Sequence, residues 1–334
     1  MLGFPHNRQI MISRTGHKSA QYGSRSDGNE KKSIAIVGSG AVGCYYGARL
    51  FETNLYNVIF YMRGDHFRVS KECGLNLTSI DGNVFIPPDQ LQAYDKIEDI
   101  GKVDWIILAL KSTGIEAIPE LLMPLLEEKR TRVICTMNGF VDEDVVRLLE
   151  GEKNEDIKPK LTKCAAVYAG MAFLCSNRIA PGQVDHSYFG KLCSSLVTSD
   201  SDHQDDLKLH ETEIVNLWEP TNIDFEYDPI YTKARWSKNL WNLPFNGISV
   251  AMNGITIDQI VNDPGLRTLA NTIMDETIAI ANKDLASRGY SREYFLGEAE
   301  VRNHCTCVLP FGSLCNFNNV CIESFVVYDS RKSK

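Results

Sequence analysis

Three polar side chains stand out in the sequence because of their type and spacing. Lys238, Asn242 and Asn246 recur every four residues, so they lie in one row if the segment 234–252 forms a helix. A protonated lysine can donate a proton to an oxygen on which negative charge develops, and neighbouring amide side chains can orient a substrate and stabilise that charge. A polar face exposed to water has the same spacing, so both interpretations stay open from the pattern alone.

The residues around this row weigh against a merely exposed face. Trp241, Phe245 and Ile248 flank the polar positions and leave the helix little surface for water. Asparagine is a poor helix former, so two asparagines on one face are costly unless they have a partner. Pro244 is expected to bend the helix beside the row, because proline interrupts the helical hydrogen bonds.

A glycine-rich turn near the start of the chain predicts a nucleotide site. The segment 33–50 is typical of a buried strand, a turn and the start of a helix, with Gly38, Gly40 and Gly43 in the G-x-G-x-x-G spacing. In such a turn the first glycine permits the bend, the second lets the backbone approach a pyrophosphate, and the third lets helix and strand pack closely. A second strand at 57–62 favours this interpretation over a glycine turn without a ligand.

The residue after this second strand indicates which dinucleotide is bound. A site for NAD usually places Asp or Glu about 20 residues beyond the glycines, where it accepts a hydrogen bond from the ribose 2′-hydroxyl. Arg63 stands at that place, and a cation there can pair with a 2′-phosphate, which favours NADP. In the alternative, Arg63 is a solvated loop residue and Asp65 takes the acidic role.

Two further polar positions follow predicted strands. Lys111 comes after the apolar run 105–110, and Asn138-Gly139 comes after the run 132–137. Open α/β sheets bind ligands beyond the carboxyl ends of their strands, so these residues and the glycine turn outline one cleft. Taken singly, the lysine is explained as a solvated loop charge and the Asn-Gly pair as a tight turn.

The bulk properties of the chain argue against several classes of function. Its 334 residues suit two domains with a sizeable core, and a net charge of −8 without a basic stripe disfavours nucleic-acid binding. No apolar run is long enough to span a bilayer, so we expect no membrane partner. The ten cysteines include no C-x-x-C pair, so we expect no metal site and reduced thiols, as in a cytoplasmic protein.

The order of elements predicts an α/β protein with a Rossmann-type N-terminal domain and a smaller all-helical C-terminal domain. Strand and helix patterns alternate from Ser33, which favours a parallel sheet, and only helical patterns follow from about Asp228. One of these helices is expected to begin at Asp263-Pro264 and to end at Gly289. The predicted segments are a disordered tail (1–32), a dinucleotide-binding domain (33–225), a helical substrate domain (226–300) and an atypical tail (301–334).

Both ends of the chain differ in composition from the rest. The segment 1–26 is basic, and a disordered tail is favoured over an organellar transit peptide because no amphipathic period is present. The segment after Val301 holds four of the ten cysteines, and Pro310 and Gly312 interrupt any amphipathic helix there. We therefore expect the helical domain to be incomplete.

These residues together resemble the ketopantoate reductase family (2-dehydropantoate 2-reductase). The resemblance extends from about Ser33 to about Val301. It is carried by Gly38-Ser-Gly-Ala-Val-Gly43, Arg63, Lys111, Asn138-Gly139 and Lys238-x-x-x-Asn242-x-x-x-Asn246. It implies an NADP-dependent oxidoreductase acting on CH–OH groups, which reduces 2-dehydropantoate with NADPH to pantoate, a precursor of pantothenate and coenzyme A.

The resemblance also implies roles for single residues. Lys238 is the expected proton donor, Asn242 and Asn246 are expected to bind the substrate, and Asn138 to contact substrate and cofactor. Arg63 is expected to hold the 2′-phosphate of NADPH. The implied cofactor-binding residues are Gly38, Ser39, Gly40, Ala41, Val42, Gly43, Arg63, Lys111, Asn138 and Ala172.

The C-terminal segment departs from the family pattern. Members of the family continue with a serine-rich turn and a Glu-Ile-Asp motif, and neither is visible in this sequence. Two alternatives to a ketopantoate reductase therefore stay open: a related 2-oxo-acid reductase, and a catalytically impaired relative that binds NADP. The implied partner is a small 2-oxo acid. The oligomeric state is left open, a homodimer included.

Overall fold

The computed structural model describes residues 31–149, 163–201 and 203–297, which fall into two compact units. Within those ranges, the first unit comprises residues 31–110, 117–136 and 142–229, and the second comprises residues 111–116, 137–141 and 230–297. The predicted tails, apart from Lys31 and Lys32, and the predicted substrate domain beyond residue 297 lie outside the described residues.

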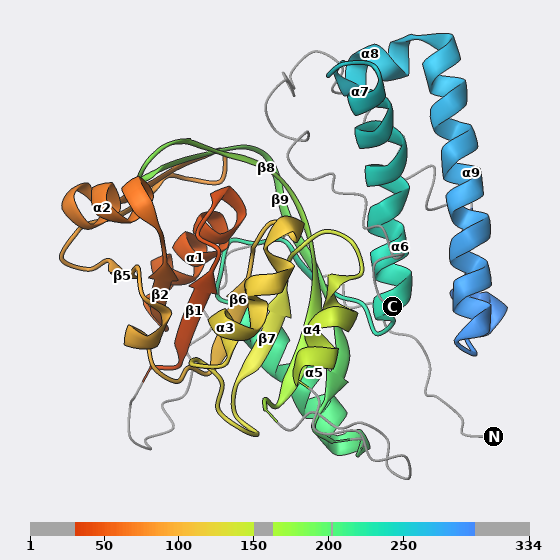
Figure 1. Ribbon diagram of the computed structural model, residues 1–334. Helices are drawn as coiled ribbons and strands as arrows, with labels where there is room; N and C mark the ends of the chain where they lie inside the picture. The colour runs from red at the N-terminus through yellow and green to blue at the C-terminus, as the bar shows by residue number, and fades with distance from the viewer. Residues whose placement is uncertain (1–30, 150–162, 202, 298–334) are drawn as a thin grey trace. The chain divides into compact units, whose positions relative to one another are not determined.

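Parallel strands form one half of the sheet in the first unit (Figure 1). They are β1 (Ser33–Val37), β2 (Asn57–Tyr61), β5 (Gln92–Tyr94), β6 (Trp105–Leu108), β7 (Arg132–Cys135) and β8 (Ala166–Ala180). Their order is β5-β2-β1-β6-β7-β8, and every neighbouring pair is parallel. β1 and β6 are apolar and buried almost throughout, because helices flank the sheet on both faces.

The other half of the sheet is mixed. It contains β9 (Gln183–Ser199), β3 (Leu75–Ser79), β4 (Val84–Ile86) and β10 (Phe225–Tyr227). β9 is antiparallel to β8, because the two residues Pro181-Gly182 that join them are too few for a crossover. β3 and β10 pair with β9 in parallel, and β4 is antiparallel to β3. The predicted parallel sheet is thus confirmed for the row β5-β2-β1-β6-β7-β8, and it is wrong for the pairs β8–β9 and β3–β4, which are antiparallel.

Helices complete the first unit. They are α1 (Ala41–Glu52), α2 (Gly64–Cys73), α3 (Ile118–Leu122), α4 (Val141–Leu149) and α5 (Gln204–Trp218), with the short 3₁₀ turn η1 (Ile97–Asp99). A further 3₁₀ turn, η2 (Ser112–Ala117), belongs to the second unit except for Ala117. Large aromatic side chains fill the space between helices and sheet. The ring centroid of Tyr46 on α1 lies 5.6 Å from that of Trp218 on α5. The ring centroid of Trp105 on β6 lies 5.7 Å from that of Tyr168 on β8.

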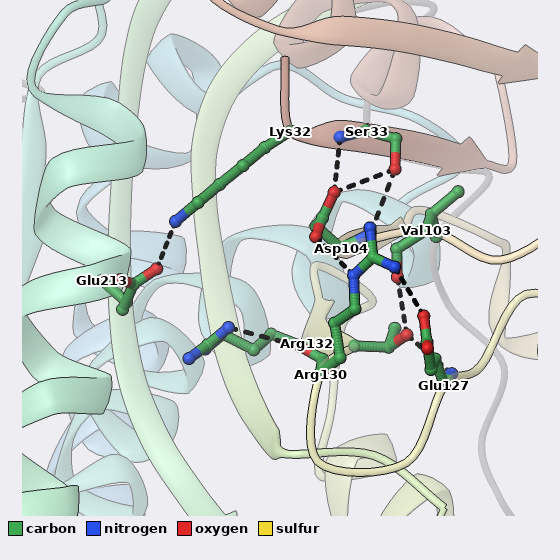
Figure 2. A network of polar contacts seen from close by, with 9 residues as sticks. Lys32, Ser33, Val103, Asp104, Glu127, Arg130, Arg132 and Glu213 are labelled. Carbon is green, nitrogen blue, oxygen red and sulfur yellow. Dashed lines mark hydrogen bonds and ion pairs between the residues drawn. The ribbon is translucent and has the colours of Figure 1, made fainter. Parts of the chain in front are cut away.

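A polar network closes the amino-terminal edge of the parallel strands (Figure 2). Asp104, just before β6, accepts hydrogen bonds from the backbone N–H (2.7 Å) and the hydroxyl (3.0 Å) of Ser33 at the start of β1. The same carboxylate pairs with Arg130 Nε at 2.8 Å, just before β7. Lys32 pairs with Glu213 on α5 at 2.6 Å. These contacts fix the starting points of three adjacent strands.

The described part of the second unit is mainly helical. It contains α6 (Tyr231–Trp241), the π-helical segment η3 (Asn242–Asn246), α7 (Gly247–Ala251), α8 (Ile257–Asn262), α9 (Pro264–Ser287) and the 3₁₀ turn η4 (Arg292–Tyr294). Phe245 and Ile248 pack with side chains of α8 and α9 in one apolar cluster. Leu240 packs with Ala281 and Leu296 in another.

The predicted boundaries of the long helix are confirmed in α9. The side chain of Asp263 caps it by accepting a hydrogen bond from Leu266 N–H at 2.8 Å, and Pro264 occupies the first helical position. Gly289 follows the last turn with φ +87°, a left-handed conformation that ends helices.

Candidate functional site

The glycine turn between β1 and α1 has the geometry of a phosphate cradle. Gly38 has φ +98°, and a Cβ there would lie 2.7 Å from the carbonyl group of Ala109, so only glycine fits. A Cβ at Gly43 would lie 2.3 Å from the carbonyl oxygen of Gly38, which shows how closely the helix approaches the turn. At Gly40 a Cβ would meet no atom within 4 Å, so the backbone there faces open space.

The first turn of α1 suits an anion. Gly40 is the N-cap and supplies no side-chain acceptor, and the first turn, with Ala41 and Val42, carries no acidic residue. The amides at a helix start have no acceptor within the helix, and the helix dipole favours negative charge there. The hydroxyl of Ser39 donates to the carbonyl of Ile36 at 3.3 Å. The residues present therefore fit the pyrophosphate of a dinucleotide.

Arg63 lies at the same edge of the sheet as this turn. Val37 at the end of β1 pairs with Tyr61 at the end of β2, so Gly38 and Arg63 both follow neighbouring strand ends. Arg63 is exposed and stands in extended conformation directly before α2. Asp65, the alternative acidic residue, forms an ion pair with Arg68 at 3.2 Å. This pairing leaves the arginine as the better candidate for contact with the ribose end of a dinucleotide.

Ala172 lies on β8, which extends beyond the end of β7. The last pair between these strands joins Cys135 to Ala169, so Ala172 is three residues further along. It pairs with Leu192 on β9 and is partly buried against the core of the first unit. Ala172 therefore belongs to the first unit, on the strand neighbouring β7, past the carboxyl end of that strand.

Lys111 and Asn138 belong to the second unit. Lys111 is exposed, and its carbonyl accepts a hydrogen bond from Gly114 N–H at 2.8 Å in η2. Gly139 has φ +86°, so Asn138-Gly139 is a turn. Arg235 on α6 donates from Nη1 to the carbonyl oxygen of Met137 at 2.8 Å, and the ring of Phe140 lies 5.3 Å from that of Trp236. The turn with Asn138 is thus attached to α6.

The row of Lys238, Asn242 and Asn246 follows α6 into a π-helical segment. Lys238 is in the last turn of α6, and the π segment begins at Asn242 and ends at Asn246. Pro244 has no N–H to offer the carbonyl of Leu240, and the predicted bend takes the form of this wider turn. In an α-helix a step of four residues goes slightly beyond one full turn. In a π-helix the same step falls slightly short of one turn, because a π-helical turn contains more than four residues. The π segment therefore keeps the three residues close to one row.

The opposite side of this helix is anchored in the apolar core. Phe245 and Leu240 are buried, and the indole N–H of Trp236 donates to Asp284 on α9 at 2.8 Å. Asn246 is 7% exposed, whereas Lys238 and Asn242 are partly exposed. A polar row held by a fixed apolar face is suited to substrate contact, since the side chains keep their positions.

Arg235 is a site residue that sequence reasoning missed. It is 2% exposed and lies three residues before Lys238, so both side chains share one face of α6. Its place three residues before Lys238, one helical turn away, is the one signal that could have singled it out. Nothing in the sequence shows that its partner is a carbonyl 98 residues earlier in the chain.

The described residues hold neither a bilayer-spanning helix nor a cluster of side chains suited to a metal ion. None of the helices there has the length and apolar character that a bilayer crossing needs. Groups of three or more His, Cys, Asp or Glu side chains placed to hold a metal ion are not found among the same residues.

Comparison with known proteins decides the family. The family model for ketopantoate reductase PanE/ApbA matches residues 34–194, and the model for its C-terminal part matches residues 231–305. A 2-dehydropantoate 2-reductase of Nostoc sp. is 30% identical over 252 residues, covering 75% of this chain and 72% of the relative. The chain belongs to the ketopantoate reductase family. The resemblance found in the sequence is thereby confirmed.

Further relatives of the ketopantoate reductase family agree in length and fold. The 2-dehydropantoate 2-reductase of Mesorhizobium japonicum is 28% identical, over 83% of this chain and 84% of the relative. The crystal structure of 2-dehydropantoate 2-reductase from Geobacter metallireducens has a TM-score of 0.71 and 27% identity, over 86% and 85% of the two chains. The predicted α/β class, with a Rossmann-like domain and a helical C-terminal region, is confirmed.

Proposed function

We propose that this protein reduces 2-dehydropantoate to pantoate with NADPH, and that Lys238 donates the proton. The observation that carries the proposal is the attachment of the Asn138 turn to α6 through Arg235 and Met137, on the helical face that holds Lys238. This attachment brings the residues expected to bind substrate into one compact unit. The names of the relatives supply the substrate, since the Nostoc and Geobacter proteins are 2-dehydropantoate 2-reductases.

The cofactor part of the proposal is supported by the first unit. The open space at Gly40 and the uncapped start of α1 fit a pyrophosphate. Arg63 is available for a 2′-phosphate, because its guanidinium is exposed at the strand end that neighbours the glycine turn. We therefore assign NADP rather than NAD as the cofactor.

The chain's own residues handle the substrate and the proton. NADPH held at the glycine turn would supply the hydride for the ketone carbon. As negative charge develops on the ketone oxygen, the ammonium of Lys238 donates a proton from Nζ to that oxygen. The amides of Asn242 and Asn246 hydrogen-bond the polar groups of the substrate, and Asn138 orients it from the neighbouring turn. The burial of Asn246 strengthens such hydrogen bonds, because water competes poorly there.

Steady-state oxidation of NADPH tests the proposal. The full chain is assayed with 2-dehydropantoate and with a series of other 2-oxo acids, and pantoate is identified as the product. We expect 2-dehydropantoate to have the highest kcat/KM. Lys238→Ala should lower kcat by roughly 10²- to 10⁴-fold and leave the Kd for NADPH unchanged. Lys283→Ala, an exposed lysine on α9, is the matched control and should keep full activity.

Two results would replace the proposal by its alternatives. A higher kcat/KM for another 2-oxo acid identifies a related reductase with a different substrate. Binding of NADPH without oxidation by any 2-oxo acid identifies an impaired relative, which is the outcome that the altered segment after Val301 favours.

A further inference from the structure

His66 occupies a buried position between the glycine turn and a distant hairpin. It lies in the first turn of α2, three residues after Arg63, and is 5% exposed. Its ring contacts residues from two other stretches of the first unit: the Ser39 to Cys44 region and Gly182. None of the functional roles assigned above uses this side chain.

One nitrogen of the ring holds the tip of the β8–β9 hairpin. The backbone N–H of Gly182 donates to His66 Nδ1 at 3.0 Å. The tip is further fixed by Asn76 N–H, which donates to the carbonyl of Gly182 at 2.8 Å. A Cβ at Gly182 would lie 3.1 Å from the carbonyl oxygen of Gly74, so the tip packs closely on the end of α2. Figure 1 shows the long ribbon of β8 and β9 reaching α2.

The other nitrogen faces the glycine turn. His66 Nε2 lies 3.6 Å from Cys44 Sγ, and Cys44 Sγ donates to the carbonyl of Ser39 at 3.3 Å. Because Nδ1 accepts from Gly182, the hydrogen of the neutral ring is on Nε2, which faces the Cys44 thiol that holds Ser39. Ser39 lies between Gly38 and Gly40, so the side chain of His66 connects the glycine turn to the hairpin tip.

We propose that neutral His66 is a positioning residue for cofactor binding, which braces the glycine turn at Ser39 against the hairpin tip at Gly182. The inference rests on the proposed function, because it assumes that the turn binds NADPH. A turn whose backbone already has its bound conformation loses less entropy when the ligand arrives, and its affinity is correspondingly higher. His66 acts through the backbone of Ser39 and does not touch the ligand.

Burial keeps the ring of His66 neutral. Burial and, to a smaller extent, the positive charge of Arg178 on β8 together lower the pKa of His66 to about 4, although the backbone carbonyl of Ser39 opposes them. On α1, burial raises the pKa of the Cys44 thiol to about 12, so the thiol is uncharged and protonated. Protonation of His66 would place an N–H at Nδ1 against the N–H of Gly182 and break the contact. The brace therefore persists throughout the neutral range.

Two variants separate the two contacts. His66→Asn keeps an acceptor near the position of Nδ1 and loses the contact with Cys44, and through it with Ser39. His66→Gln keeps a donor near the position of Nε2 and loses the acceptor for Gly182. We expect each variant to raise the Kd for NADPH about tenfold, measured by fluorescence titration, with kcat at saturating NADPH within about twofold of wild type. His203→Gln, an exposed histidine before α5, should leave the Kd unchanged.

A second readout is independent of the cofactor. In the wild-type protein at neutral pH, ¹⁵N chemical shifts should show His66 neutral with its hydrogen on Nε2, and amide exchange at Gly182 should speed up in His66→Gln but not in His66→Asn. A hydrogen on Nδ1, or NADPH affinities within twofold of wild type in both variants, overturns the proposal. Wild-type protein that binds no NADPH contradicts the proposed function instead, while the tautomer and the exchange rates still report on the brace.

Discussion

Arg235 donates a hydrogen bond over 2.8 Å to the carbonyl oxygen of Met137, and so joins the residue before Asn138 to the helix that carries Lys238. The guanidinium is buried, and the carbonyl that it binds lies two residues after the end of β7. A buried main-chain acceptor that loses its donor is left without a hydrogen bond from either protein or water, and this lowers the free energy of unfolding. The contact therefore serves both the stability of the second unit and the position of Asn138.

Arg235→Lys should separate these two effects. The lysine keeps the charge but lacks the planar fork of the guanidinium, so the Met137 carbonyl loses a well-placed donor. We expect a loss of about 1–3 kcal/mol in the free energy of unfolding and a severalfold rise in KM for 2-dehydropantoate. Arg147→Lys, in an exposed ion pair with Asp144 on α4, should change neither quantity. An unchanged KM alongside a lower stability would show that Arg235 is structural only.

Arg63→Ala should reduce the preference for NADPH over NADH. A hydrogen-bonded contact between arginine and phosphate is worth about 1.5–3 kcal/mol, so we expect the Kd for NADPH to rise roughly 10- to 100-fold while that for NADH stays the same. Titration of both dinucleotides measures the ratio. Arg68→Ala is the matched control, because this arginine lies on α2, the helix that Arg63 precedes, and pairs with Asp65. An equal change for both dinucleotides would exclude a role at the 2′-phosphate.

The parts of the fold that were predicted correctly depend on local sequence. The turn at Gly38 and the start of α9 at Asp263 each follow from residue types within a few positions, because turn and cap geometry are set locally. The mixed half of the sheet was not predicted, since the pairing of β3 with β9 joins segments more than 100 residues apart. Arg235 and His66 were missed for the same reason: their partners, Met137 and Gly182, are distant in sequence.

Pro244→Ala should relax the π-helical segment. Alanine restores a backbone N–H, so an ordinary α-helical hydrogen bond to Leu240 becomes available and the turn from Asn242 to Asn246 can tighten. Asn246 then rotates relative to Lys238, and we expect KM for 2-dehydropantoate to rise about tenfold while the thermal midpoint stays equal or increases. Pro264→Ala, at the first position of α9 where no N–H is required, should leave KM unchanged. An unchanged KM in Pro244→Ala would mean that the π segment does not set the position of Asn246.

Asp104→Asn should lower stability in a pH-dependent way, because the carboxylate joins the starts of β1, β6 and β7 (Figure 2). Burial alone would raise the pKa of Asp104, but hydrogen bonds from Arg130 and Ser33 outweigh it, so the pKa is lower than usual. A carboxyl with a lowered folded-state pKa stabilises fully above its unfolded-state pKa, and the stabilisation is lost as the pH falls through the folded-state value. We expect Asp104→Asn to cost about 1–2 kcal/mol at neutral pH, measured as the shift in urea midpoint, and the difference from wild type to shrink in acid. Asp65→Asn, which breaks an exposed ion pair, should cost less than about 0.5 kcal/mol at any pH. A deficit in Asp104→Asn that stays constant into acid would show that shape, not charge, holds this edge of the sheet.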